Sequence, residues 1–245
     1  MYNCLIIGAG RSGTSLVAGI LNNGHYFFGK NLIPPRAANP KGFFEDNTIN
    51  RLINEPILKL ALPKYTVGQR WLGKVPLTAP LYTNTLIDTR IKHAITNTPF
   101  CYKDPRFCYT LPIWKRFIDK KTTKYICVFR HPKLTIQSVL SSCKTDSYLK
   151  NINMTAEKSE KIWYKMYQHV LEKHIHSGSW LFVHYNQLFT KETLDKIKVY
   201  LNTPTVQYNF PEDKLKKKVN IQYKLTKNTK EVYLKLCKYA GVHNG

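Results

Sequence analysis

Residues 5–15 read LIIGAGRSGTS, an apolar run that leads directly into a glycine-rich turn. The run predicts a buried strand at residues 3–7, and the residues after the turn predict a helix that begins at Thr14. The first backbone N–H groups of a helix have no partner within it, so they form an anion site together with the positive end of the helix dipole. This order of strand, glycine turn and helix predicts an α/β fold with a phosphate-binding loop.

Two well-known phosphate loops share part of this spacing, and each lacks a residue here. Gly8 and Gly13 match the glycine spacing of a Walker A loop, but Thr14 occupies the position of its lysine. The dinucleotide pattern is matched by Gly8, Gly10 and Gly13, yet the acidic residue required about 20 positions later is missing, since the first acid is Glu45. A third interpretation is a loop that carries its own cation, Arg11.

A second segment, residues 124–142 with the sequence KYICVFRHPKLTIQSVLSS, repeats the change from strand to helix. Its apolar part predicts a strand that ends in Arg130, and Pro132 suits the first turn of a helix. Ser138 follows Arg130 by eight positions, about two helical turns. An NTPase would carry a magnesium-binding acid after such a strand, whereas an arginine suits an anion. The carboxyl ends of parallel strands share one edge, so both segments are expected to meet one ligand.

The two segments resemble the donor-binding motifs of sulfotransferases that use 3′-phosphoadenylyl sulfate. Residues 11–15, RSGTS, resemble the 5′-phosphosulfate loop, and the pair Arg130 and Ser138 resembles the 3′-phosphate motif. The stretches GFFED at 42–46 and KDPR at 103–106 are similar to bacterial members of the family. The resemblance implies that the donor is held by Gly10, Arg11, Ser12, Gly13, Thr14, Ser15, Arg130 and Ser138.

The same resemblance directs attention to four candidate catalytic residues. Arg11 is expected to stabilise charge on the leaving phosphate. Glu45 follows two phenylalanines and is our candidate for the base that takes the acceptor proton, with Asp104 as the alternate base. Lys103 ends a predicted strand on the ligand edge, and either Lys103 or Arg106 is expected to contact the sulfonate or an acidic acceptor. The alternative is that Asp104 and Arg106 form a structural pair that closes the turn. An alternative interpretation is that Glu45 and Asp46 only stabilise the N-terminus of the following helix electrostatically.

Alternating strand and helix patterns predict a three-layer, P-loop NTPase-like α/β fold with a central, mostly parallel sheet flanked by helices. We expect one sulfotransferase-like domain over residues 1–245, with a substrate-side insertion region at 31–100 and a basic C-terminal extension at 203–245. The run at 214–218 is the candidate for closing over the nucleotide, although a solvated charge run explains it as well. The patterns predict strands at 3–7, 100–103, 124–129 and 180–184, and helices at 14–22, 45–60, 80–97, 107–118, 132–143, 155–176, 190–201 and 226–239.

The amino-acid composition indicates which classes of ligand the protein is expected to bind. A net charge of +23 favours anionic ligands, and a nucleotide donor explains it without invoking nucleic acid, for which no binding motif is present. No apolar run approaches the roughly 18 residues that span a bilayer, and no signal peptide is recognisable, so a cytoplasmic protein is expected. The six cysteines show no metal-ligand spacing, and no metal is expected to be required.

The sequence and its resemblance therefore favour an enzyme that transfers a sulfuryl group from 3′-phosphoadenylyl sulfate to an acceptor hydroxyl. The resemblance to bacterial members implies a mild preference for a carbohydrate acceptor, while protein tyrosine and small metabolites stay open. Two alternatives remain at this point. One is a nucleotide kinase or NTPase with a degenerate loop, and the other is a polyanion-binding protein without catalytic activity.

Overall fold

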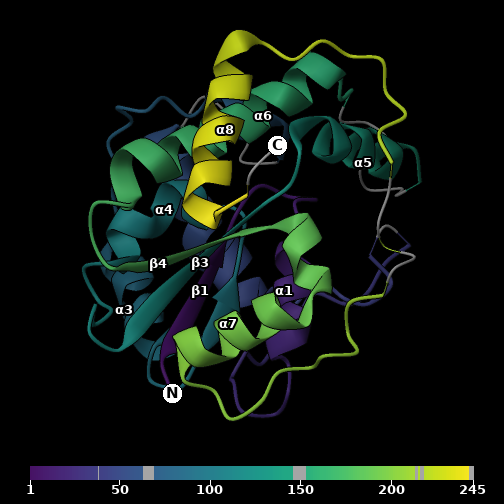
Figure 1. The fold of residues 1–245 in the computed structure, drawn as a ribbon. Coiled ribbons are helices and arrows are strands. Elements are labelled where there is room, and N and C mark those ends of the chain that lie inside the picture. Colours follow the sequence, from purple (N-terminus) through teal and green to yellow (C-terminus); the bar gives the residue numbers. More distant parts are fainter. Residues whose placement is uncertain (38, 63–68, 146–152, 213–214, 216–217, 243–245) are drawn as a thin grey trace.

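A computed structural model describes residues 1–37, 39–62, 69–145, 153–212, 215 and 218–242. Its centre is a sheet of four parallel strands in the order β2-β1-β3-β4 (Figure 1). The strands are β1 (Asn3–Ile7), β2 (Cys101–Lys103), β3 (Thr123–Phe129) and β4 (Ser179–His184). The predicted α/β class and the parallel sheet are confirmed, and each predicted strand is found within one residue of its expected ends.

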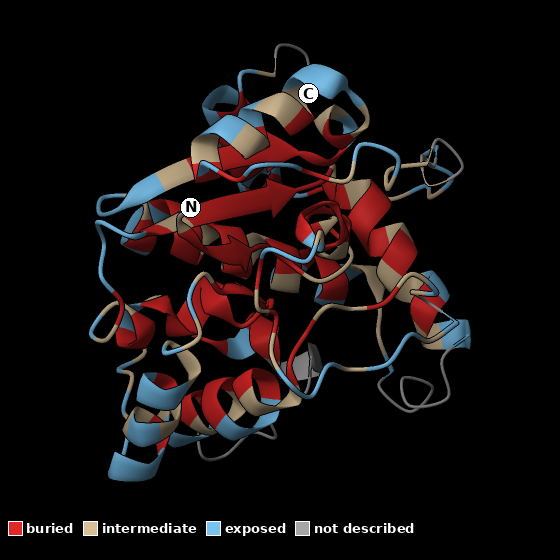
Figure 2. Cartoon of the chain, turned by 90° about the horizontal axis from the view of Figure 1, so that it is seen from below, coloured by how far each residue is buried: buried red, intermediate tan, exposed pale blue. Residues whose placement is uncertain are grey.

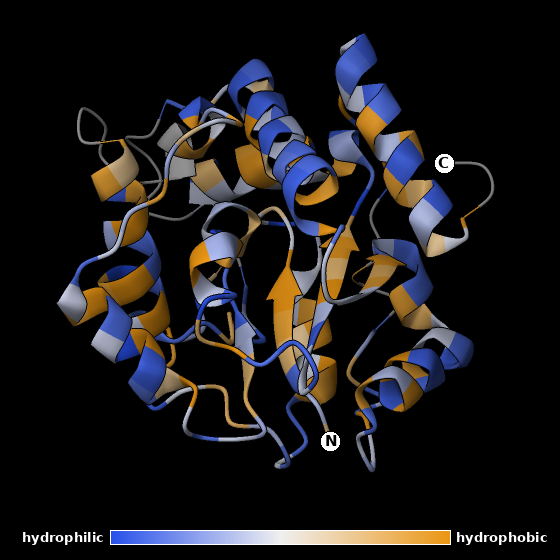
Figure 3. Ribbon diagram, turned by 90° about the vertical axis from the view of Figure 1, so that its left-hand side faces the viewer, coloured by the Kyte–Doolittle hydropathy of each residue, from blue (hydrophilic) through white to orange (hydrophobic). Residues whose placement is uncertain are grey.

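The strands are apolar along their whole length because both faces of the sheet are covered. Successive strand side chains point to opposite faces, so Leu5 and Ile7 of β1 pack into one apolar core while Cys4 and Ile6 pack into the other. Figure 2 shows buried residues concentrated in these strands and on the inner sides of the helices. The hydropathy pattern agrees, with orange strands beneath helices whose outer faces are blue (Figure 3).

The helices form the two outer layers. One face is covered by α1 (Thr14–Leu21) and α7 (Lys191–Leu201). The other is covered by α2 (Glu55–Ala61), α3 (Thr85–Ala94), α4 (Phe107–Trp114), α6 (Ala156–His169) and α8 (Lys227–Ala240). Helix α5 (Pro132–Thr145) packs on α6 beyond the carboxyl ends of the strands.

Several predicted helices differ in their limits. The helix expected at 45–60 begins as a π-helical segment (Thr48–Asn54) before α2, because Asp46 accepts hydrogen bonds from the N–H groups of Thr48 and Ile49 and so starts the helix there. The helices expected at 80–97 and 107–118 are shorter. The helix expected at 155–176 consists of α6 followed by a π-helical segment (Val170–His174).

Strand order creates a crevice. The chain leaves β1 toward β2 on one side and leaves β3 toward β4 on the other, so the connections diverge between β1 and β3. Ligands of open α/β sheets bind at this kind of switch point, beyond the carboxyl ends of the strands. The loop after Ile7 and the residue after Phe129 therefore border the same crevice, since Ile7 pairs with Cys127 across the two strands.

Candidate functional site

The loop after β1 depends on two glycines. Gly8 and Gly13 have φ values of +155° and +99°, which side chains rarely tolerate. A Cβ on Gly8 would lie 2.2 Å from the carbonyl oxygen of Val128, and one on Gly13 would lie 2.5 Å from the ring of Tyr185. Glycine at both positions lets the loop pass close to β3 and to Tyr185.

A buried tyrosine on α6 holds this loop against β3. The Tyr167 hydroxyl donates to the carbonyl of Val128 at 2.7 Å and accepts from the N–H of Ala9 at 3.1 Å. Burial raises the pKa of Tyr167 well above its ordinary value, so the group stays protonated and keeps this donor role. Sequence reasoning missed Tyr167, because nothing in the helical pattern of α6 separates it from a core residue.

The two sequence motifs are in direct contact. Arg11 Nε donates a hydrogen bond of 3.1 Å to Ser138 Oγ, although the residues are 127 positions apart. Ser12 lies behind this pair, with its hydroxyl 3.4 Å from that of Thr135 on the first turns of α5. The expected convergence of the glycine loop and the Arg130/Ser138 segment is thus present in the structure.

Arg130 occupies an unusual environment. It is only 5% exposed, and its guanidinium carbon lies 4.1 Å from the ring centre of Tyr185. Within the part of the chain that the structure describes, its buried Nε and Nη2 atoms have no hydrogen-bond partner. Burial lowers the pKa of Arg130, and the positive charge of Arg11 acts in the same direction. A buried cation with unused donors is costly unless an anion meets it.

These residues line a cavity of about 350 Å³, which we call the donor cavity. All the residues that the sequence assigned to donor binding border this cavity except Ser12. Ser12 is a fully buried residue of the loop, and its hydroxyl lies near that of Thr135 instead. Its lining consists of Gly10, Arg11, Gly13, Thr14, Ser15, Leu16, Ala37, Asn39, Pro40, Lys41, Gly42, Phe43, Glu45, Lys103, Pro105, Arg130, Ser138, Tyr185, Phe210 and Leu215.

Ser15 connects the start of α1 to the segment that forms the roof of the cavity. Its hydroxyl donates to the carbonyl of Phe43 at 3.3 Å and accepts from Asn39 at 3.1 Å. Thr14 beside it is buried and also borders the cavity. The helix N-terminus therefore faces the donor cavity, with one of its two hydroxyl groups already engaged by the protein.

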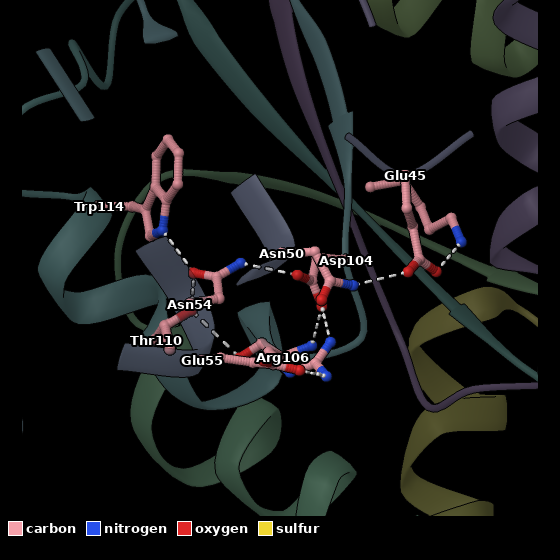
Figure 4. A network of polar contacts seen from close by, with 9 residues as sticks. Glu45, Asn50, Asn54, Glu55, Asp104, Arg106, Thr110 and Trp114 are labelled. Carbon is pink, nitrogen blue, oxygen red and sulfur yellow. Dashed lines mark hydrogen bonds and ion pairs between the residues drawn. The ribbon is translucent and has the colours of Figure 1, made fainter. Parts of the chain in front are cut away.

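Glu45 lies at the boundary of the donor cavity, where Lys103 and Asn50 hold it. The Lys103 ammonium forms an ion pair with Glu45 Oε1, and Asn50 donates to Oε2 at 2.9 Å (Figure 4). Asp46, by contrast, caps the following helix. The two neighbouring acids have separate roles, and Glu45 is the one that faces the cavity.

Asp104 is placed differently from Glu45. It is fully buried, and Asn54 donates to Oδ2 at 3.0 Å while the backbone N–H of Arg106 donates to Oδ1 at 2.8 Å. Arg106 in turn pairs with Glu55 at 2.6 Å, in the network of Figure 4. Asp104 borders neither of the two cavities at this edge. Its contacts join the end of β2 to the helices around it.

A second cavity of about 310 Å³ adjoins the first, and we call it the acceptor-side cavity because much of its lining comes from the region at 31–100 that the sequence assigns to the substrate side. The two share Gly10, Phe43, Glu45 and Pro105. The remaining lining of the acceptor-side cavity consists of Ala9, Ile33, Arg36, Asn50, Arg51, Glu55, Leu72, Arg106, Thr135, Val139, Met154, Ser159, Ile162, Trp163 and Met166. Glu45 therefore stands where two cavities meet.

The C-terminal part of the chain crosses the donor cavity. The Tyr185 hydroxyl donates to the carbonyl of Leu215 at 2.9 Å, and Lys41 donates to the carbonyl of Phe210 at 2.8 Å. Gln137 accepts from the N–H of Asn220 at 2.8 Å. Of the basic run at 214–218, residues 214, 216 and 217 lie outside the described residues.

The described residues contain neither a metal-binding cluster nor a helix able to cross a membrane. Within those ranges, no three His, Cys, Asp or Glu side chains gather in a group that would hold a metal ion. None of the helices in the same ranges has the length and apolar character needed to cross a membrane.

Fold and site together define an α/β protein whose glycine-rich loop after β1 carries Arg11 and lacks the Walker lysine. The sequence profile of the sulfotransferase family matches residues 4–205, and the chain belongs to that family. Among curated protein sequences, none matches the chain significantly.

Solved structures show the same fold. A sulfotransferase domain from the curacin biosynthetic pathway is 15% identical, with a TM-score of 0.56 over 96% of this chain and 97% of that chain. A sulfotransferase domain from the Synechococcus PCC 7002 olefin synthase is 17% identical, with a TM-score of 0.58 over 96% of this chain and 94% of that chain.

Proposed function

We propose that the protein transfers a sulfuryl group from 3′-phosphoadenylyl sulfate to an acceptor hydroxyl. The observation that carries this proposal is Arg130, a buried guanidinium with two nitrogens that no described residue bonds, at a cavity bordered by the Arg11 loop. Family membership supports the reaction type. The positive net charge of the chain favours such a polyanionic donor.

The residues fit the two charged ends of this donor. The glycine loop and the N-terminus of α1 suit the 5′-phosphosulfate, because backbone N–H groups and Arg11 converge there. Arg130 suits the 3′-phosphate, since an anion would bond the donors that the described residues leave without a partner. Ser138 already accepts from Arg11 and so connects the two ends.

The chemistry assigns a role to each polar group between the cavities. The acceptor oxygen forms a bond to sulfur, and the bond between sulfur and the 5′-phosphate oxygen breaks. The leaving phosphate keeps the electron pair, which Arg11 and Lys103 stabilise as cations. The hydroxyl proton passes to Glu45, whose orientation Asn50 fixes. Asp104 is the weaker candidate for this base, because both of its oxygens accept hydrogen bonds inside the protein.

The proposal includes a reducing compartment such as the cytoplasm, which the six free thiols suit. A nucleotide kinase is the second candidate, and the spacing of Gly8 and Gly13 is the observation that favours it. Thr14 in place of the Walker lysine and Arg130 in place of a magnesium-binding acid argue against it. The resemblance mildly favours a carbohydrate as the acceptor, and the residues that line the acceptor-side cavity provide a separate criterion for the acceptor.

Ligand-induced stabilisation tests the proposal. At about 100 times its Kd, a ligand adds roughly 2.7 kcal/mol of stability, so adenosine 3′,5′-bisphosphate is expected to raise Tm by about 5–10 °C. ADP, which lacks the 3′-phosphate, is expected to raise Tm much less. Arg130→Ala is expected to abolish the difference between the two nucleotides, whereas Arg116→Ala, at an exposed arginine paired with Asp88, retains it. Equal shifts with both nucleotides in the unmodified protein would overturn the 3′-phosphate assignment.

A further inference from the structure

The acceptor-side cavity carries apolar surface that the described part of the chain leaves uncovered. Four of its side chains, those of Ile33, Phe43, Val139 and Met154, are half-buried. None of the four packs into either apolar core formed by the described residues. They come from three separate parts of the chain yet face one cavity. Apolar area of this kind gains free energy when an apolar ligand removes it from water.

The deeper wall of the same cavity is also apolar. Leu72, Trp163 and Met166 are buried and belong to the core on that face of the sheet. A ligand that reaches past Glu45 would thus contact aliphatic and aromatic surface. The volume of about 310 Å³ lies at the small end of the range for small-molecule sites.

Several polar groups of this lining are bonded within the protein, whereas the indole N–H of Trp163 and the Nε of Arg106 are buried donors that no described residue bonds. Asn50 donates to Glu45, Arg106 pairs with Glu55, and the Thr135 hydroxyl lies 3.4 Å from that of Ser12. A sugar buried here would bring more hydroxyl groups than the two unpartnered donors of Trp163 and Arg106 serve, and each hydroxyl left unbonded is costly. A molecule with a single hydroxyl would present that group to Glu45 and bury the rest against apolar walls.

We infer that the acceptor is a small, largely apolar alcohol whose one reacting hydroxyl meets Glu45, rather than a carbohydrate. This inference rests on the proposed sulfuryl transfer. In the step, the alcohol oxygen forms the new S–O bond and its proton passes to Glu45. The donor is consumed, and adenosine 3′,5′-bisphosphate leaves with the electron pair of the broken bond.

The test supplies the 245-residue chain with 3′-phosphoadenylyl sulfate and a series of linear primary alcohols of increasing length. Glucose and cellobiose are tested alongside. Release of adenosine 3′,5′-bisphosphate is measured by chromatography. Each methylene that enters the cavity is expected to raise kcat/KM by about fourfold, until the cavity is filled. The sugars are expected to stay at the rate seen without acceptor.

A pair of matched variants shows where the apolar body binds. Val139→Asn places an amide in the cavity and is expected to flatten the dependence of kcat/KM on chain length. Val199→Asn makes the same change on α7 at a residue that is 78% exposed, and it is expected to leave that dependence intact. Both variants are expected to keep the Tm shift caused by adenosine 3′,5′-bisphosphate, which shows that they are folded and bind the nucleotide.

The outcomes separate the two proposals. If the nucleotide causes no Tm shift, the proposed function fails and the acceptor assignment fails with it. If the shift is present but a sugar is turned over faster than every alcohol, or chain length has no effect, only the apolar acceptor is overturned. The same holds if Val139→Asn and Val199→Asn respond identically to chain length.

Discussion

Arg130 and Glu45 are both buried ionic groups, but the protein treats them in opposite ways. Glu45 has a cation and an amide as partners, so its charge is compensated without a ligand. Arg130 has an aromatic ring beneath it and two nitrogens without partners in the described chain. The first arrangement suits a group that must keep one orientation through a reaction. The arrangement around Arg130 suits a group that binds an anionic ligand.

Glu45→Gln tests the role of the carboxylate. The amide cannot take the acceptor proton, so transfer is expected to fall by at least 100-fold, in keeping with the usual contribution of a general base. The Tm shift with adenosine 3′,5′-bisphosphate is expected to persist, because the donor cavity keeps Arg11 and Arg130. Initial rates and thermal shifts measured on the same preparation check both statements.

Glu160→Gln serves as the control for this substitution. Glu160 is also a buried carboxylate, but it accepts hydrogen bonds from Tyr223 and Thr226 and borders neither cavity. It is expected to lower Tm while leaving the transfer rate of the folded protein unchanged. If Glu45→Gln retains full activity, Glu45 is not the base, and Asp104 is the next residue to test.

The turn between β1 and α1 depends on close approach as well as on backbone conformation. Gly13→Ala is expected to abolish the nucleotide-induced Tm shift, because its methyl group would collide with the Tyr185 ring on which Arg130 rests. Gly24→Ala separates the two effects: Gly24 has φ +84° but open space around its Cβ position. It is expected to cost about 1 kcal/mol and to keep nucleotide binding. A Gly13→Ala protein that still binds the nucleotide would show that the approach of Tyr185 is dispensable.

The elements of this fold were largely predictable, whereas the partners of the site residues were not. Strands β1, β3 and β4 are continuous apolar runs, and the glycine and proline signals around them set their ends. Convergence of Arg11 with Ser138 followed from the parallel sheet. The ion pair between Lys103 and Glu45 is different, because it joins residues 58 positions apart and depends on how an irregular segment folds over β2.

Local patterns also carry no sign of certain supporting residues. Tyr167 reads as one more apolar position of α6, and only the packed structure shows that its hydroxyl links Ala9 to Val128. Asn54 is similar: within its helix it is an ordinary polar residue, yet it accepts from Thr110 and Trp114 and donates to Asp104. Such roles arise from contacts between distant elements, which residue spacing does not encode.

Three buried histidines connect the stability of the molecule as a whole to pH. His169, His174 and His184 lie in different elements, and burial lowers the pKa of each to about 4. Neighbouring cations act in the same direction, among them Lys165 near His169 and Lys115 near His174. The folded protein therefore holds all three rings neutral at pH values where an unfolded chain would protonate them.

The sign of the effect follows from proton binding. Between the unfolded pKa of about 6.5 and the folded value of about 4, the unfolded chain binds more protons, so stability falls as the pH is lowered through this window. From pH 7.5 to 5.5 each histidine is expected to cost a little over about 1 kcal/mol. The three together cost about 3–4 kcal/mol, which lowers Tm by roughly 6–16 °C. Thermal unfolding followed by circular dichroism at both pH values measures this.

His174→Gln identifies the source of this pH dependence. Glutamine does not titrate, and its amide is able to replace the hydrogen bond between the ring and the carbonyl of Cys108. The variant is expected to lose about one third less stability between pH 7.5 and 5.5, whatever its Tm at pH 7.5. Most carboxylates stay ionised above pH 5.5, so they contribute little to the difference. An unchanged Tm difference between the two pH values in His174→Gln would show that His174 is not held neutral by the fold.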